Sequence, residues 1–298
     1  MPSNPLRALA AVASLAMLAP AIASVSAQTA RPAAVESAAE KPALVARLLE
    51  KARLGAAIEA WQEMLLSADS VPECDCDDDA QRQRFGEAWR TAVTAAFDAR
   101  GIVAEFEAGY AAAFTTSELG ELLAFFETPL GQKVGAIERE AIESEVSEAE
   151  ALAGMVASMQ ALEAAPERKI VLKQLTARMG GEEAMVEMFV NLGVGAALGA
   201  AAATPAGRPR VDEATIVAGV EQGREELRKT LASAVIAQNA WMYRSLSLGE
   251  LKQYDELYAT PLWRRSTALS IVLFNRAMRR QALAIGARFA REWNAESL

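Results

Sequence analysis

Apolar residues recur every three or four positions along most of the chain, which is the period of an α-helix. Strand-like alternation is almost absent. Residues spaced in this way lie on one face of a helix, where they are buried against neighbouring helices. The ridges are Leu44, Leu48, Ile58, Trp61 and Leu65, then Phe85, Trp89, Val93 and Phe97, then Phe106, Tyr110 and Phe114. We therefore predict an all-α protein whose aromatic residues pack its core.

Residues 114–133 predict two helices joined by a one-residue corner. Thr115 and Glu118 have the spacing of a capping box, in which each side chain bonds the backbone amide of the other residue. Pro129 has no amide hydrogen and disfavours helical geometry just before it, so the first helix ends near Thr128. Thr128 can then cap a second helix that has Pro129 at its first position.

The same pattern returns 132 residues later, in residues 246–265. Ser247, Glu250, Leu251, Tyr258, Thr260 and Pro261 stand where the first copy has Thr115, Glu118, Leu119, Phe126, Thr128 and Pro129. We expect two tandem, internally duplicated helical units, 41–165 and 166–298, packed as one helical array. One long helix from Pro129 to Ala165 should close the first unit, and another from Pro261 to about Trp293 the second.

The first copy resembles the domain of unknown function 2059 family over residues 43–145. The residues that carry the resemblance are Phe114, Glu118, Leu119, Phe125, Phe126, Thr128, Pro129, Gly131 and Lys133. The resemblance implies an exported bacterial helical protein and assigns no reaction. The second copy departs from the pattern where Trp263 stands opposite Gly131, so we expect its corner to pack differently.

The N-terminus reads as a secretory signal peptide over residues 1–27. Arg7 is followed by an uncharged apolar run, Pro20 breaks that run, and Val25-Ser26-Ala27 supplies the small residues of a cleavage site. An uncleaved anchor is the alternative. Residues 28–40 are small and polar and are expected to form a flexible linker. We therefore expect an exported protein, in the periplasm or outside the cell.

Composition removes several kinds of chemistry. The chain has no histidine, which excludes Ser-His-Asp triads and histidine-dependent metal sites. It has 39 acidic and 30 basic residues, for a net charge of −9. Nucleic acid is an unfavourable partner for such a chain, because its binding relies on basic surface. We predict no cofactor.

Cys74 and Cys76, within a run of aspartates, are the most unusual chemical feature. They could form a local disulfide, pair with another chain, stay as inert thiols or contribute to a metal site. A closed zinc site needs four ligands, and the chain has no other cysteine. The local disulfide is the favoured interpretation, with metal binding the weakest.

Two further segments have competing interpretations. Glutamates crowd the helix after Pro129, and we expect most of them on a solvated face, because Val134, Ile137, Ala141 and Val146 form its apolar stripe. Residues 188–207 carry no charge and include Gly195-x-x-x-Gly199, which predicts a closely packed core helix more readily than a membrane span. We expect no stable transmembrane span after signal cleavage.

These observations favour a non-catalytic binding or scaffolding module of the cell envelope. Its partner would be an envelope protein, a peptide or an apolar ligand, held in a groove between residues 188–203 and the aromatics Trp241 and Tyr243. Self-association into a homo-oligomer is also possible. The alternatives are a hydrolase with two buried carboxylates facing a cleft, and a redox or metal-handling protein built on Cys74 and Cys76.

Overall fold

The computed structural model describes residues 40–67, 71, 74, 76, 78–143, 146–202 and 211–295, and in these ranges the chain is helical throughout, with no strand. This confirms the predicted all-α class. The predicted signal peptide and residues 28–39 of the predicted linker lie outside the described residues. The first six helices are α2 (Glu40–Lys51), α3 (Leu54–Leu65), α4 (Asp79–Ala96), α5 (Ala99–Ala113), α6 (Thr116–Glu127) and α7 (Pro129–Glu143).

The remaining helices run from the end of the first half to the C-terminus. They are α8 (Glu148–Glu163), α9 (Pro166–Arg178), α10 (Gly181–Ala202), α11 (Glu213–Gln222), α12 (Arg224–Met242), the short 3₁₀ helix η2 (Tyr243–Ser245), α13 (Leu248–Ala259) and α14 (Pro261–Ala295). Helix α14 is the long closing helix expected from Pro261 to about Trp293.

The long helix expected from Pro129 to Ala165 is wrong, because the chain breaks it into α7 and α8. The cause is a third capping box. The Ser147 hydroxyl accepts the Glu150 amide, and the Glu150 carboxylate accepts the Ser147 amide at 3.0 Å. Satisfying the free amides of a new helix N-terminus in this way favours a new start over continuation.

Helices of the two halves pack in corresponding pairs. In the first half α2 packs on α5 and α6, and α3 packs on α5; in the second half α9 packs on α12 and α13, and α10 packs on α12. This correspondence supports the internal duplication, which stays a prediction. The halves share one core, because α14 also packs on α4 and α5, and α12 packs on α8.

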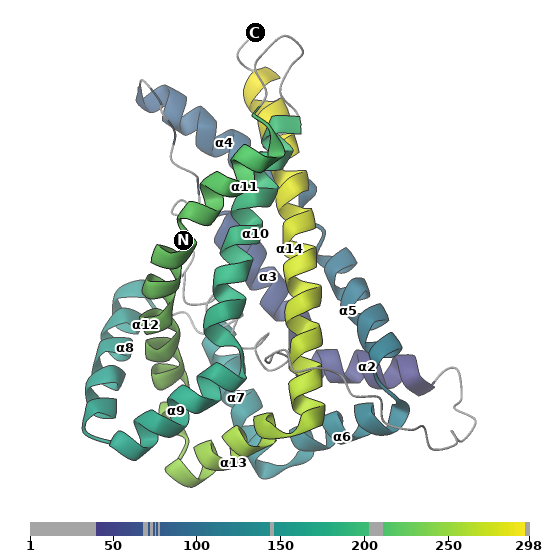
Figure 1. Cartoon of the computed structure of the whole chain (residues 1–298), viewed down its shortest axis with the longest axis vertical. Helices are drawn as coiled ribbons and strands as arrows, with labels where there is room; N and C mark the ends of the chain where they lie inside the picture. Colours follow the sequence, from purple (N-terminus) through teal and green to yellow (C-terminus); the bar gives the residue numbers. More distant parts are fainter. Residues whose placement is uncertain are drawn as a thin grey trace.

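Helices α10 and α14 run side by side through the middle of the molecule (Figure 1) and form its most extensive helix pair. Their backbones meet so closely that a Cβ atom at Gly199 would lie 2.2 Å from the Leu283 carbonyl oxygen. Among the described residues, α10 is the one helix long and apolar enough to cross a membrane. Its glycine face is occupied by α14, as a core helix requires.

Candidate functional site

The helix–corner–helix unit occurs once in each half, and both predicted capping boxes are present. Glu118 accepts the Thr115 amide at 2.8 Å, and Thr115 accepts the Glu118 amide at 3.2 Å. In the second half, Glu250 accepts the Ser247 amide at 2.6 Å, and Ser247 accepts the Glu250 amide at 3.2 Å. Local hydrogen bonds therefore set the start of α6 and α13 identically.

Each corner is held by one threonine hydroxyl. Thr128 Oγ1 donates to the Phe125 carbonyl at 2.7 Å and accepts the Gly131 amide at 3.0 Å, so it joins the end of α6 to the start of α7. Thr260 Oγ1 donates to the Leu257 carbonyl at 2.8 Å, but it is 3.4 Å from the amide nitrogen of Trp263 in the next helix. The second corner is therefore wider.

The width of each corner follows from the residue two positions after the proline. A Cβ atom at Gly131 would lie 2.0 Å from the Phe125 carbonyl oxygen, so the narrow corner requires glycine. The second corner has Trp263 there, and its ring packs on the first corner, 5.2 Å from the Phe125 ring and edge-on to Tyr258 at 5.4 Å. The second corner therefore packs differently from the first, as expected, because Trp263 makes an aromatic contact between the halves.

Two ion pairs link the corners reciprocally. Lys133 Nζ lies 2.8 Å from the Glu250 carboxylate, and an Arg265 guanidinium nitrogen lies 2.6 Å from that of Glu118. Each partner in one pair is 132 residues from its counterpart in the other, so the halves exchange contacts as subunits do in a two-fold dimer. The hydrogen bond from Lys133 is the largest cause that lowers the pKa of Glu250 to about 2.

Glu138 on α7 is an exception to the expected solvated acidic face, since Glu140 and Glu143 on the same helix are exposed. Its side chain is 2% exposed and accepts hydrogen bonds from the hydroxyls of Tyr243 at 2.9 Å and Tyr254 at 3.4 Å. Burial raises the pKa of Glu138 to about 8, against the opposing effect of these hydrogen bonds. The carboxyl group is therefore mostly protonated at neutral pH, which lowers the cost of burying it.

The second buried acid of the described residues, Asp255, is paired with Arg178 at 2.7 Å. Neither Glu138 nor Asp255 lines either of the pockets described here. Glu59 and Glu107 do line a pocket of about 220 Å³ between α3 and α5, but both are exposed. The paired buried carboxylates that the hydrolase hypothesis requires at a cleft are not found in either pocket.

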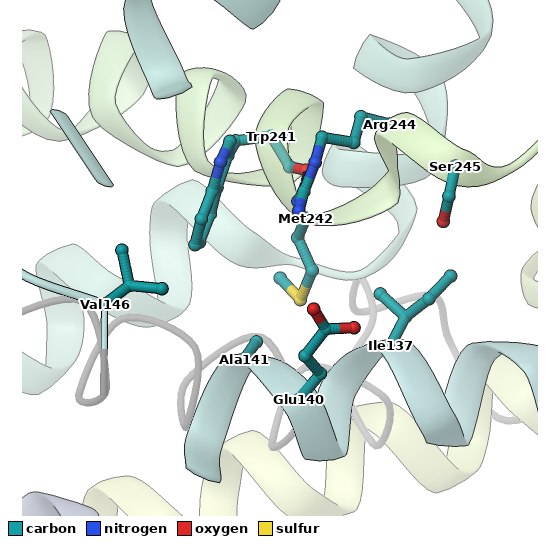
Figure 2. A pocket seen from close by; sticks show the side chains of 8 residues that line it. All are labelled: Ile137, Glu140, Ala141, Val146, Trp241, Met242, Arg244 and Ser245. Carbon is teal, nitrogen blue, oxygen red and sulfur yellow. Dashed lines mark hydrogen bonds between the residues drawn. The ribbon is translucent and has the colours of Figure 1, made fainter. Parts of the chain in front are cut away.

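A pocket of about 120 Å³ opens between α7 and the end of α12. Figure 2 shows how its walls lie: the side chain of Met242 points toward α7, and the carboxylate of Glu140 points back toward Met242. The complete lining is Ile137, Glu140, Ala141, Val146, Trp241, Met242, Arg244 and Ser245. It combines an apolar floor with one acidic and one basic side chain.

The equivalent place, between α14 and α5, is packed differently. Shifting by 132 residues places Leu273 opposite Ala141 and Gly109 opposite Trp241. Leu273 reaches so close to Gly109 that a Cβ atom there would be 2.7 Å from it. The pocket thus has a small residue on α7 and a large one on α12, whereas the equivalent contact has a large residue on α14 and a small one on α5.

The remaining predicted features lie elsewhere. Cys74 and Cys76 are joined by a disulfide on the segment before α4, and the described residues contain no group of acidic or cysteine side chains able to hold a metal. The groove expected between residues 188–203 and Trp241 with Tyr243 is not formed. Helix α14 covers Gly195 and Gly199 of α10, Tyr243 is fully buried, and Trp241 lines the α7 pocket instead.

Sequence reasoning missed three features: the burial of Glu138, the start of α8 and the pocket. The burial of Glu138 had one detectable signal, its four-residue spacing from Val134 and Ile142 on the buried stripe of α7. The start of α8 was signalled by the Ser147 and Glu150 spacing. The pocket had no signal in the sequence, because its two walls come from residues about a hundred positions apart.

The geometry defines a class of protein, an all-helical array with a capped Thr-Pro corner in each half and a small pocket beside the junction. Residues 102–164, from α5 to α8, match the model of a family described as an uncharacterized protein conserved in bacteria, DUF2059. The resemblance predicted for the first half is therefore confirmed, whereas the match does not extend to the second copy. No curated protein and no solved structure matches the chain.

Proposed function

We propose that this chain is an exported, non-catalytic binding module of the cell envelope that holds an apolar group of its ligand in the pocket between α7 and α12. The apolar run near the N-terminus supports export. The observation that carries the binding role is the pocket itself, walled by Ile137, Trp241 and Met242 and open at its rim. The apolar side chains of its floor lack packing partners on the open side, and a ligand group placed there would supply them.

The volume limits what can enter. Pockets for drug-sized ligands enclose about 300–1,000 Å³, whereas a cavity of about 150 Å³ accepts one benzene molecule. The α7 pocket, at about 120 Å³, therefore suits a single aliphatic side chain. Its ligand should be small, or should insert one residue.

Filling the pocket tests this proposal. Ala141→Leu introduces the side chain that the second half carries at the equivalent position, Leu273. The probe is N-acetyl-L-leucine methylamide, and its binding is monitored by the methyl NMR shifts of Met242 and Ile137. We expect saturable shifts in the wild type and affinity at least about tenfold weaker in the variant, because a leucine side chain occupies the same space.

Ala104→Leu is the matched control, since Ala104 lines the other pocket, between α3 and α5. It should leave the shifts of Met242 unchanged, and thermal unfolding shows whether both variants fold. Absence of saturable shifts in the wild type with this probe and also with free L-leucine, or equal weakening by both substitutions, would contradict the proposal.

A further inference from the structure

We infer that the ligand of the α7 pocket is a small apolar α-amino acid in its zwitterionic form, an inference that rests on the proposed function. The features that point to it are a carboxylate and a guanidinium set around one apolar floor. Glu140 would bind the ammonium group, Arg244 the carboxylate, and the floor the side chain.

The two charged residues come from different elements. Glu140 projects from α7, and Arg244 lies in η2, on the opposite wall beside Trp241 (Figure 2). Among the ion pairs of the described residues, none joins Glu140 to Arg244. In Figure 2 the Met242 side chain lies between the Glu140 carboxylate and the Arg244 guanidinium, and both charged residues line the pocket.

Arg244 is positioned by Trp241. One guanidinium nitrogen donates to the Trp241 carbonyl at 2.6 Å, and the guanidinium carbon lies 4.9 Å from the centroid of the Trp241 ring. A guanidinium has five N–H donors in a planar fork. Fixing one donor and the plane of the group leaves the remaining donors for a carboxylate, with little further loss of rotamer entropy on binding.

The apolar floor selects the side chain. Ile137 and Ala141 on α7 face Met242 across a volume of about 120 Å³, enough for a valine or leucine side chain. The flexible thioether of Met242 can adapt to branched chains of slightly different shape. Aromatic side chains would need more room, so we expect weaker binding of phenylalanine and none of tryptophan.

The equivalent place between α14 and α5 serves as an internal control. Residues 132 positions away from Glu140 and Arg244 are Val272 and Ala112, and Leu273 fills the space opposite Ala141. The equivalent site therefore has no charge on either wall. The helices at that place pack without either charge, so the pairing of Glu140 with Arg244 across the pocket is not a requirement for such helices to pack.

The test compares four probes on the full chain: L-leucine, N-acetyl-L-leucine, L-leucinamide and N-acetyl-L-leucine methylamide. The second lacks the ammonium charge, the third the carboxylate charge, and the fourth both. Binding is measured by the methyl shifts of Met242 and by calorimetry. Because hydrogen bonds between charged groups are about twice as strong as neutral ones, L-leucine should bind at least about tenfold more tightly than each of the others.

Two variants assign the charges to residues. Glu140→Gln should weaken L-leucine and L-leucinamide but leave N-acetyl-L-leucine unchanged or tighter. Arg244→Met should weaken L-leucine and N-acetyl-L-leucine but spare L-leucinamide. Glu121→Gln on α6 and Arg139→Met on α7 change the same charges at exposed positions outside the pocket, and should leave all four affinities unchanged.

The outcomes separate this inference from the proposed function. Equal binding of L-leucine and its doubly blocked analogue overturns the zwitterion and leaves an apolar-group pocket, as for an inserted peptide side chain. Absence of binding by all four probes overturns both. Ligand discrimination that survives Glu140→Gln and Arg244→Met together overturns the assignment of the charges to this pocket.

Discussion

At the residue scale, Glu138 is the least expected feature of the protein. A carboxylic acid is seldom fully buried without a charged partner, and here its partners are tyrosine hydroxyls. Burial is the main cause that raises the pKa of Tyr243, and the nearby carboxyl of Glu138 is the next. Proton loss from either group is thus opposed by the other, so the neutral forms stabilise the junction between the halves.

Glu138 predicts that the protein becomes less stable as pH rises. Its folded-state pKa of about 8 exceeds the ordinary value of 4.5, so its contribution is complete below about pH 4.5 and is lost as pH rises through about 8. The free energy of unfolding should fall by up to about 1.4 kcal/mol per pH unit within that window. Urea unfolding between pH 5 and 9 measures the slope.

Glu138→Gln removes the titrating group and keeps an oxygen able to accept from Tyr243 and Tyr254. The variant should lose most of this slope and become more stable than the wild type above about pH 8. A slope unchanged by Glu138→Gln would show that another group causes the pH dependence.

At the scale of single elements, the Thr-Pro corners show how one hydroxyl ends one helix and begins the next. Proline supplies a first helical residue that needs no amide partner, and the threonine satisfies a carbonyl before it and an amide after it. The corner forms from residues within six positions of each other. Its geometry is therefore available locally, before the halves pack.

The two corners predict unequal effects of one substitution. Thr128→Val removes two good hydrogen bonds and should lower the free energy of unfolding by about 1–2 kcal/mol. Thr260→Val, the matched change in the second half, should cost less, because the amide of Trp263 is already 3.4 Å from the hydroxyl. Chemical denaturation compares the two, and an equal or larger loss at Thr260 would contradict the hydrogen-bond account.

At the scale of the whole molecule, α14 joins the two halves by packing against helices of both. It packs on α10 in its own half and on α4 and α5 in the other. The hydroxyl of Tyr110 on α5 lies 2.7 Å from that of Ser270 on α14, and Ser270 is the residue 132 positions after Glu138. Tyr243 of the second half therefore contacts Glu138 on α7, and Tyr110 of the first half contacts Ser270, the equivalent position on α14.

The α10–α14 contact predicts opposite effects of the same substitution at two glycines. Gly199→Ala places a methyl group 2.2 Å from a Leu283 backbone oxygen, so the helices must separate, and we expect a loss of about 1–3 kcal/mol. Gly219→Ala on α11 meets nothing within 4 Å and should add up to about 1 kcal/mol of helix stability. Thermal unfolding of both variants checks the pair; stabilisation by Gly199→Ala would refute the close contact.

The sequence by itself determined the elements whose causes are local. The all-helical class follows from apolar spacing, and the starts of α6 and α13 follow from capping boxes three residues wide. The ends at Thr128 and Thr260 follow from the next residue being proline. The start of α8, which was not predicted, also has a local cause, the capping box of Ser147 and Glu150. Each of these rests on hydrogen bonds or steric limits within a few residues.

Only the tertiary structure decided which faces meet. Glu138 is buried because Tyr243, 105 positions away, covers it, and the pocket exists because Ala141 stands opposite Trp241 and Met242. Helix α10 presents glycines that the sequence assigned to a groove, and α14 fills that face instead. Burial and pKa depend on desolvation by residues brought together from distant parts of the chain, which a local pattern does not specify.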